Sequence, residues 1–320
     1  MYKQVSIVIL LVFLSAGVFC DSPDDSYNKN LDEMWISFIE STDSAVKAET
    51  LINIGILGKG NQNVIYNVNN YLMELSYLVS WGVSVDYMMV SASITAIMEL
   101  GDSSSYPVLF SVLCAGYPEV IFLEAYGALD LIPGNLLQFL AGVIERNPPE
   151  EKFIAFKAGA NSERLTASER GQLAELAFEM GFAAGEEDAN ITEMRYAAVL
   201  TLTSLRWTKA NMLAIKHYYR VQTDFLQSSV PKARLIEAIA CLGAVGNSDA
   251  ALALGLQLGL INARTATTGI FDTEITLAIV RALGLIGDNA AFDHLLYTSN
   301  LPYSNDIKVA AREALARLKW

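Results

Sequence analysis

The stretch Ala282-Leu283-Gly284-Leu285-Ile286-Gly287-Asp288 is the most informative part of this 320-residue sequence. It combines an apolar helix end, a glycine that stops the helix and a polar turn. The same arrangement recurs as Asn53-Ile54-Gly55-Ile56-Leu57-Gly58-Lys59, as Ala96-Ile97-Met98-Glu99-Leu100-Gly101-Asp102 and as Ala240-Cys241-Leu242-Gly243-Ala244-Val245-Gly246-Asn247. Such recurrence along a chain is typical of proteins that stack helical repeats.

The apolar residue near the end of each such helix gives a register for the whole chain. Aligning on it yields these anchors: Ile54, Ile97, Leu129, Leu202, Leu242, Leu283 and Leu315. Successive anchors are about 30–45 residues apart, as in two-helix repeats, except for one step about twice as long. Small residues recur one and four positions before most anchors, on the same helical stripe as the anchors. We therefore expect these small residues to let neighbouring helices approach closely.

Residues 307–318 have an apolar-basic start and an Ala-Leu close, and residues 275–292 read as a second helix followed by the turn into the next unit. These last units resemble HEAT repeats, in the variant shared with phycobilisome-lyase-type proteins. The resemblance is good over about 230–320, fair over 45–145 and poor over 147–192. It implies an all-α, armadillo-type fold. We therefore predict an α-solenoid of about seven HEAT-like helix pairs.

The N-terminus has the parts of a secretory signal peptide. Lys3 is the only charged residue before Asp21, residues 5–14 are mostly apolar, and Ser15-Ala16-Gly17 are small. The apolar run is shorter than the roughly 20 residues that span a bilayer. We expect a signal peptide over 1–20 and export, to the periplasm or cell envelope if the source is bacterial. A retained membrane anchor is the alternative.

Cys20 stands where a bacterial lipoprotein carries its lipidated cysteine, and residues 21–30 resemble an acidic, flexible linker. Phe19 fits badly, because lipoprotein signals favour a small residue before the cysteine. Lipidation of Cys20 and ordinary cleavage nearby are both open, and a lipid anchor there is the only membrane attachment that we expect. Cys114 and Cys241 lie in apolar runs of distant repeats, so we expect buried thiols and no disulfide between them.

The remaining chain divides into HEAT-like repeats over 31–146 and 193–320, with 147–192 between them as an irregular repeat or a hinge. Two prolines at 148 and 149 should end one helix and start another. Residues 158–162 have the composition of a loop. Thr166 or Ser168 should then cap a long helix that reaches about Ala184.

The charge and the motifs exclude several classes of function. With 22 basic and 35 acidic residues the net charge is −13, which opposes nucleic-acid binding. No zinc, nucleotide-binding or hydrolase motif is present, so we expect no cofactor, no metal and no catalytic residue. His217 and His294 are the only histidines, and we expect both at the surface or at the edge of a groove.

Two groups of residues are candidates for contact with a partner protein. Glu49, Glu124 and Glu237 lie five positions before their anchors and would line one groove if that position faces a concave surface. The alternative is scattered charges on separate repeats. Tyr218, Tyr219 and Arg220 form a second candidate patch, because interfaces are enriched in tyrosine and arginine. Helix packing is the alternative for these three residues.

We therefore expect a non-catalytic, exported scaffold that binds a protein partner through its concave face. Its partner and oligomeric state do not follow from the sequence. A lyase that attaches bilin chromophores is one alternative, which the resemblance permits but the signal peptide disfavours. A structural protein of the cell envelope that assembles by stacking its repeats is another.

Overall fold

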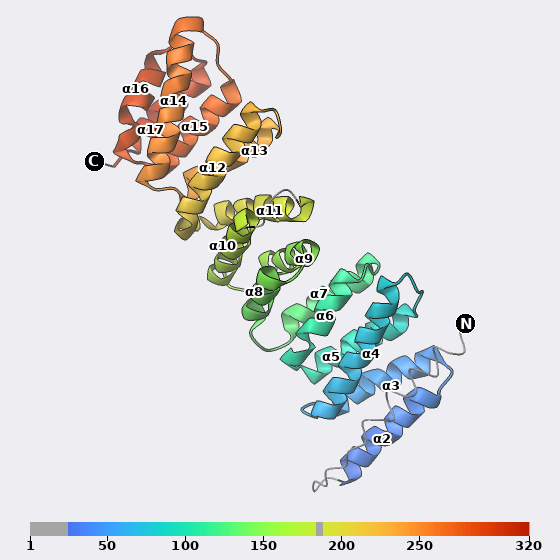
Figure 1. Cartoon of the computed structure of the whole chain (residues 1–320). Helices are drawn as coiled ribbons and strands as arrows, with labels where there is room; N and C mark the ends of the chain where they lie inside the picture. The colour runs from blue at the N-terminus through green and yellow to red at the C-terminus, as the bar shows by residue number, and fades with distance from the viewer. Residues whose placement is uncertain (1–24, 184–187, 320) are drawn as a thin grey trace. The chain divides into compact units, whose positions relative to one another are not determined.

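The computed structural model describes residues 25–183 and 188–319. These residues form sixteen α-helices that pack as neighbouring pairs, with no β-strand among them (Figure 1). The prediction of an all-α fold is therefore confirmed for the described residues. The predicted signal peptide, Cys20 and the start of the predicted linker lie outside them.

The chain divides into two compact units, Met1–Ala128 and Leu129–Trp320, called unit 1 and unit 2 here. Unit 1 contains α2 to α6 and most of α7. The bounds are α2 (Asp25–Glu40), α3 (Ser44–Leu57), α4 (Gln62–Ser80), α5 (Tyr87–Leu100), α6 (Tyr106–Cys114) and α7 (Glu119–Leu131). In α2, the buried Leu31 and Phe38 lie two turns apart on one face. This helix begins within the range 21–30 that we expected to be a linker.

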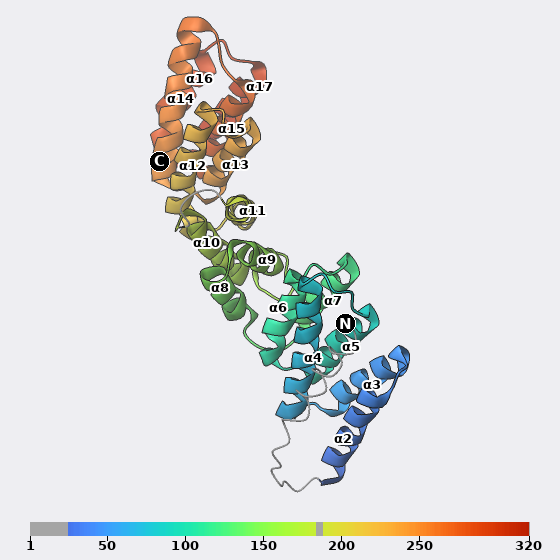
Figure 2. The same cartoon turned by 45° about the vertical axis from the view of Figure 1, so that its right-hand side comes forward.

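Among its described residues, unit 2 contains the end of α7 and ten further α-helices. Their bounds are α8 (Leu136–Arg146), α9 (Pro149–Ala160), α10 (Ala167–Ala183), α11 (Ala189–Leu205), α12 (Asn211–Leu226), α13 (Lys232–Val245), α14 (Ser248–Thr268), α15 (Thr273–Ile286), α16 (Phe292–Asn300) and α17 (Asn305–Ala316). The second helices of the pairs pack in sequence, from α9 through α11, α13 and α15 to α17. Figure 2 shows the same helices from another side. We call α8, α10, α12, α14 and α16 the first helices of unit 2.

Each of the seven anchors lies on the second helix of a pair, namely α3, α5, α7, α11, α13, α15 and α17. The alignment missed α9, the second helix that pairs with α8. The small residues beside the anchors have the predicted role. A Cβ atom on Gly284 of α15 would lie 2.9 Å from the Cβ of Ala314 in α17. A Cβ on Gly55 of α3 would lie 2.6 Å from the Cα of Ala96 in α5. Side chains at these glycines would force the helices apart, because real Cβ atoms are not found at such distances.

The glycines that end the repeated stretches are helix caps for two different reasons. Gly101 and Gly287 have left-handed backbone angles, with φ of 63° and 69°, which glycine adopts without strain. Gly58 and Gly246 have ordinary φ values of −78° and −72°. A Cβ at either of these would collide with the helix's own carbonyl oxygen and with the next helix. The sequence located all four helix ends without distinguishing these causes.

The segment 147–192 is more helical than its sequence indicated. As predicted, α8 ends just before the two prolines and α9 begins at the second. However, α9 continues to Ala160, so the expected loop over 158–162 is wrong for its first three residues. Thr166 caps α10 as expected: its hydroxyl accepts from Glu169 N at 3.2 Å, and Thr166 N donates to the Glu169 carboxylate at 2.8 Å.

Candidate interaction surfaces

The three glutamates of the predicted series have different surroundings. Glu49 is exposed, whereas Glu124 and Glu237 are half-buried. Glu124 accepts a hydrogen bond from the hydroxyl of Ser91, and Glu237 forms an ion pair with Arg234 at 3.0 Å. Glu49 and Glu124 belong to unit 1 and Glu237 to unit 2. Two of the three carboxylates are therefore already engaged by a neighbouring side chain.

The position that these glutamates occupy lies at the outer side of the second helices in unit 2. The residues there are half-buried: Ala197, Glu237, Ala278 and Ala310. The residues three positions later are exposed: Leu200, Ala240, Arg281 and Glu313. This side therefore presents mainly alanines and charged residues, and Leu200 is the one large apolar residue among the eight positions.

The second candidate patch is divided between the core and the surface. Tyr218 is 1% exposed and lies in the core, where burial raises the pKa of its phenol. This corrects the expectation for Tyr218, which shares a buried helical stripe with Ala214 and Val221 and is not available to a partner. Tyr219 is exposed, and Arg220 lies 4.0 Å from Asp224.

The surface position predicted for His217 is wrong. Its ring is fully buried among Phe178, Phe182 and Tyr196, with ring centroids 5.3, 6.3 and 5.6 Å away. Burial, reinforced by the positive charge of Arg195, lowers the pKa of His217 to about 3. Neither ring nitrogen has a hydrogen-bond partner in the structure. The imidazole is therefore neutral near pH 7 and contributes to the core.

His294 also serves packing. It is half-buried on α16, and its ring covers two glycines of α14. A Cβ on Gly255 would lie 3.1 Å from the ring, and one on Gly259 would lie 3.0 Å from it. His294 thus holds α16 against α14.

The exposed Tyr219 belongs to a larger apolar surface that the sequence analysis did not identify. On α12 the exposed apolar residues recur at helical spacing on one side, and the next first helices continue the pattern. We call this surface the apolar face of unit 2, and it consists of Met212, Tyr219, Leu226, Leu252, Leu256, Leu260, Leu296 and Tyr297. Its helices are α12, α14 and α16, and α14 packs against both of the others.

The apolar face is held in place from behind. On α14 its three leucines are 52–69% exposed, while Ala250, Leu254 and Leu258 on the opposite side are fully buried. At the side of α14, Gln222 of α12 and Gln257 share a hydrogen bond of 2.7 Å. The four-residue spacing of the leucines was visible in the sequence and could have identified the face.

No protein-family model matches this chain, and no curated protein matches it. The functional argument therefore depends on the chain's own surfaces and cavities.

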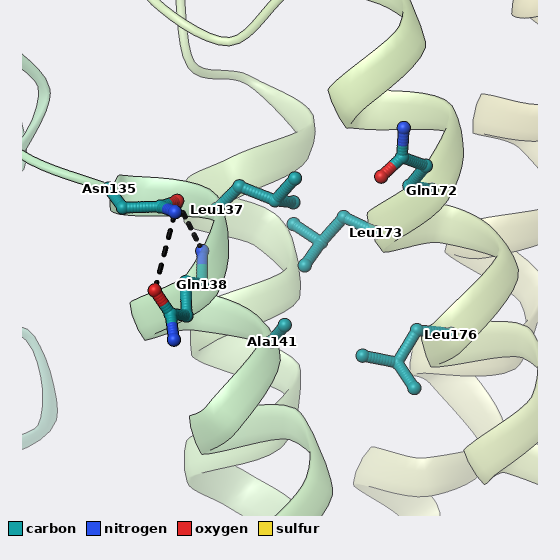
Figure 3. Close-up of a pocket in the computed structure, with 7 residues that line it drawn as sticks. All are labelled: Asn135, Leu137, Gln138, Ala141, Gln172, Leu173 and Leu176. Atoms are coloured by element: carbon teal, nitrogen blue, oxygen red, sulfur yellow. Dashed lines mark hydrogen bonds between the residues drawn. The ribbon is translucent and has the colours of Figure 1, made fainter.

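A pocket of about 350 Å³ lies between α8 and α10 (Figure 3). Its lining is uncharged: Asn135, Leu137, Gln138, Ala141, Gln172, Leu173 and Leu176. Figure 3 shows Leu137, Leu173 and Leu176 pointing into the space between the helices. Asn135 and Gln138 bond to each other at the rim, where Asn135 Oδ1 caps Gln138 N at 2.9 Å. The pocket offers no titratable group for chemistry.

Two further searches cover the described residues only. Among them, no group of three or more histidine, cysteine or acidic side chains could hold a metal ion. None of the described helices combines the length and the apolar character needed to cross a membrane. Cys114 and Cys241 are not joined by a disulfide, and burial raises the pKa of the Cys241 thiol to about 11.

Proposed function

We propose that this protein is a non-catalytic, exported scaffold of HEAT-like repeats that binds a partner protein. The observation that carries this proposal is the apolar face of unit 2, where three consecutive first helices expose large apolar side chains. Extended apolar surface on a soluble domain typically marks an interaction site. Aromatic residues and methionine, which are present here, are enriched in interfaces.

The architecture of unit 2 supports the repeat part of the proposal. Its second helices pack one against the next in chain order, as expected when each repeat contacts only its neighbours. Repeats that stack in this way form an α-solenoid with extended surfaces for binding. The glycine and alanine contacts between successive second helices recur at the same register in α13, α15 and α17.

The sequence placed the partner on a concave face, with Glu237 among its contacts. In unit 2 the second helices expose single large apolar residues, such as Leu200 and Leu285, among alanines and charges. The first helices α12, α14 and α16 expose leucine, tyrosine and methionine in groups. Buried apolar and aromatic side chains provide most of the affinity at protein interfaces. We therefore place the main contact on the apolar face and retain the second-helix side as the alternative.

Export is supported by the sequence of residues 1–20. Mass spectrometry of the mature protein tests it, and also distinguishes ordinary cleavage from lipidation at Cys20. A mature chain that begins within residues 17–22 supports export. A chain that keeps its first 20 residues contradicts it.

Paired substitutions test the binding proposal. Leu252→Ser with Leu256→Ser removes two side chains of the apolar face, and Leu200→Ser with Leu285→Ser removes leucines of similar exposure, 51% and 55%, from second helices. After cross-linking in native cells, we expect the first pair to reduce recovery of a specific partner at least tenfold, about 1.4 kcal/mol. The second pair should leave recovery unchanged. The reverse result would assign binding to the second-helix side.

Self-assembly through the same face is the second candidate function. The apolar faces of two copies could pack against each other and bury their leucines. Light scattering over a range of protein concentrations distinguishes the two functions. A molar mass that rises with concentration in the native protein, but not in the Leu252→Ser, Leu256→Ser variant, would favour self-assembly over binding of another protein.

A further inference from the structure

One side of α4 exposes a row of aromatic and sulfur-containing side chains. We call this row the aromatic stripe, and it consists of Tyr66, Met73, Tyr77 and, directly after the helix, Trp81. The spacing of seven, four and four residues places them on one side of the helix. Tyr66, Tyr77 and Trp81 are 62%, 61% and 72% exposed, which is unusual for such large side chains.

The aromatic stripe has a rigid support. On the opposite side of α4, Val68 and Leu72 are fully buried, and Asn61 caps the start of the helix through two backbone N–H groups. The rings of Tyr77 and Trp81 are 5.6 Å apart and contact each other at an angle of 48°. The stripe is thus a preformed surface whose rings need little ordering on binding.

The sequence around the stripe is rich in carboxylates, and its nearest basic residue in the sequence is Lys59, in the turn before α4. From residue 60 to residue 145 the sequence contains no lysine, arginine or histidine. The carboxylates of unit 1 in this range are Glu74, Asp86, Glu99, Asp102, Glu119 and Glu124. Among the described residues, every ion pair lies in unit 2. None of these six carboxylates forms an ion pair among the described residues.

Three of these carboxylates lie close to α4. Glu74 and Asp86 affect the pKa of a tyrosine on the helix, and Asp102 lies near its first residue. Burial, with added repulsion from Asp86 and Glu74, raises the pKa of Tyr71 on α4 to about 12. Hydrogen bonds from Ser104, and a further one from the side chain of Gln62, the first residue of α4, lower the pKa of Asp102. Negative charge thus lies close to both the start and the middle of the helix that carries the stripe.

We propose that the aromatic stripe of α4 docks a lysine- and arginine-rich segment of a partner protein. Exposed tyrosine and tryptophan rings attract ammonium and guanidinium groups through their faces, and nearby carboxylates add charge complementarity. The apolar stems of lysine and arginine, or intervening leucines, cover Met73 and the ring edges. The same acidity disfavours anionic lipid headgroups as the occupant. The inference rests on the proposed scaffold function, but it uses unit 1 and a different surface.

The full chain and two synthetic peptides of equal length test this proposal. One peptide carries lysine and leucine at helical spacing, and the other has glutamate in place of lysine. We expect fluorescence anisotropy to show binding of the lysine peptide at least tenfold tighter than binding of the glutamate peptide. The affinity should fall as salt rises, because charge contributes to it. Equal binding of both peptides would overturn the proposal.

Substitutions separate the stripe from general attraction to an acidic protein. Tyr77→Ala with Trp81→Ala should weaken binding of the lysine peptide about tenfold, because two ring contacts are removed. Val120→Ser with Leu123→Ser, which removes two exposed apolar residues of α7 in unit 1, should leave peptide binding unchanged. Unaltered affinity in the Tyr77→Ala, Trp81→Ala variant would overturn the proposal, provided that circular dichroism shows an intact fold. A negative result for peptide binding does not change the outcome expected when a partner is recovered through the apolar face of unit 2. The two proposals can therefore be refuted independently.

Discussion

A Cβ atom on Gly243 of α13 would lie 2.8 Å from the Cα of Ala282 in α15. Gly243 directly follows its anchor, and Ala282 directly precedes the next one. The same relation joins Gly284 to Ala314 and Gly55 to Ala96. Between α11 and α13, where these positions hold larger residues, Thr203 hydrogen-bonds the thiol of Cys241. The same register of contacts therefore joins α3 to α5, α11 to α13, α13 to α15 and α15 to α17.

Gly243→Ala should destabilise unit 2. The new methyl group would overlap the backbone of Ala282, and overpacking of this kind costs about 1–3 kcal/mol. We expect thermal unfolding followed by circular dichroism to show a lower midpoint. Gly127→Ala on α7 is the control, because a Cβ there meets no atom within 4 Å. That variant should be neutral or slightly more stable, since alanine favours helix by about 0.5–1 kcal/mol. Equal loss in both variants would contradict the close approach at Gly243.

Asp130→Ala should loosen the connection between α9 and α10. The Asp130 carboxylate accepts hydrogen bonds from the Ser162 hydroxyl and from the backbone N–H groups of Glu163 and Arg164, the latter two at 3.0 and 3.2 Å. Its removal takes the acceptor from the buried Ser162 hydroxyl, whereas the exposed N–H groups of Glu163 and Arg164 can bond to water, so the expected cost is about 1 kcal/mol.

Hydrogen exchange measured by mass spectrometry detects this change. We expect faster exchange over residues 162–166 in Asp130→Ala. The control Asp293→Ala removes an exposed carboxylate from the first turn of α16 and should leave exchange in this segment unchanged. Identical exchange in native protein and Asp130→Ala would refute the role of this carboxylate.

His217 should make unit 2 less stable in mild acid. Its pKa is lowered to about 3 in the folded protein, against about 6.5 when unfolded, so the unfolded chain takes up the proton first. The contribution to stability is complete above about pH 6.5 and is lost as the pH falls from there toward 3. Between pH 6.5 and pH 5 the expected loss is about 2 kcal/mol.

Replacement of the histidine isolates this effect from the titration of carboxylates. The fall in unfolding midpoint between pH 7 and pH 5 should be smaller in His217→Gln than in the native protein. His294→Gln, which removes the half-buried histidine of α16, is the matched substitution for comparison. A His217→Gln variant with the full native slope would show that this ring does not remain neutral in the fold.

Cys241 should react with an alkylating reagent far more slowly than Cys114. Burial raises its pKa to about 11, which leaves very little thiolate at pH 8, and the thiolate is the reactive form. Cys114 is only half-buried. Alkylation of the folded protein with iodoacetamide, read by peptide mass spectrometry, should modify Cys114 at least about tenfold faster. Both should react at similar rates in denaturant, and equal rates in the folded protein would contradict the burial of Cys241.

The sequence was most informative where one residue type serves one structural purpose. Glycines after apolar helix ends located the caps, and small residues beside the anchors located the contacts between second helices. The exception is α9, where a Cβ on Gly159 would meet Leu173 of the neighbouring first helix α10. Gly159 thus allows contact with a first helix, whereas Gly243 allows contact with the next second helix. The alignment on the repeated stretch therefore did not detect α9.

The candidate site was harder to predict because neighbouring residues of one helix can lie on its buried and its exposed side. Tyr218 and Tyr219 are adjacent in sequence, yet one lies in the core and the other on the surface. The spacing of Ala214, Val221 and the two residues His217 and Tyr218 marks the buried stripe of α12. The helical spacing of these residues could have been recognised in the sequence. The cluster of aromatic residues instead suggested that Tyr218 and Tyr219 form one surface patch. The lack of cations between residues 60 and 145 was also readable, but only the structure shows exposed rings in that range.

Photo-cross-linking from single positions tests the binding account most directly. A photoreactive amino acid replaces Leu256 on the apolar face or, separately, Leu285 on a second helix, two leucines of comparable exposure. In native cells we expect Leu256 to give a discrete adduct with one partner protein and Leu285 to give none. An adduct from Leu285 alone, or none from either position while the protein is present and folded, would contradict the account.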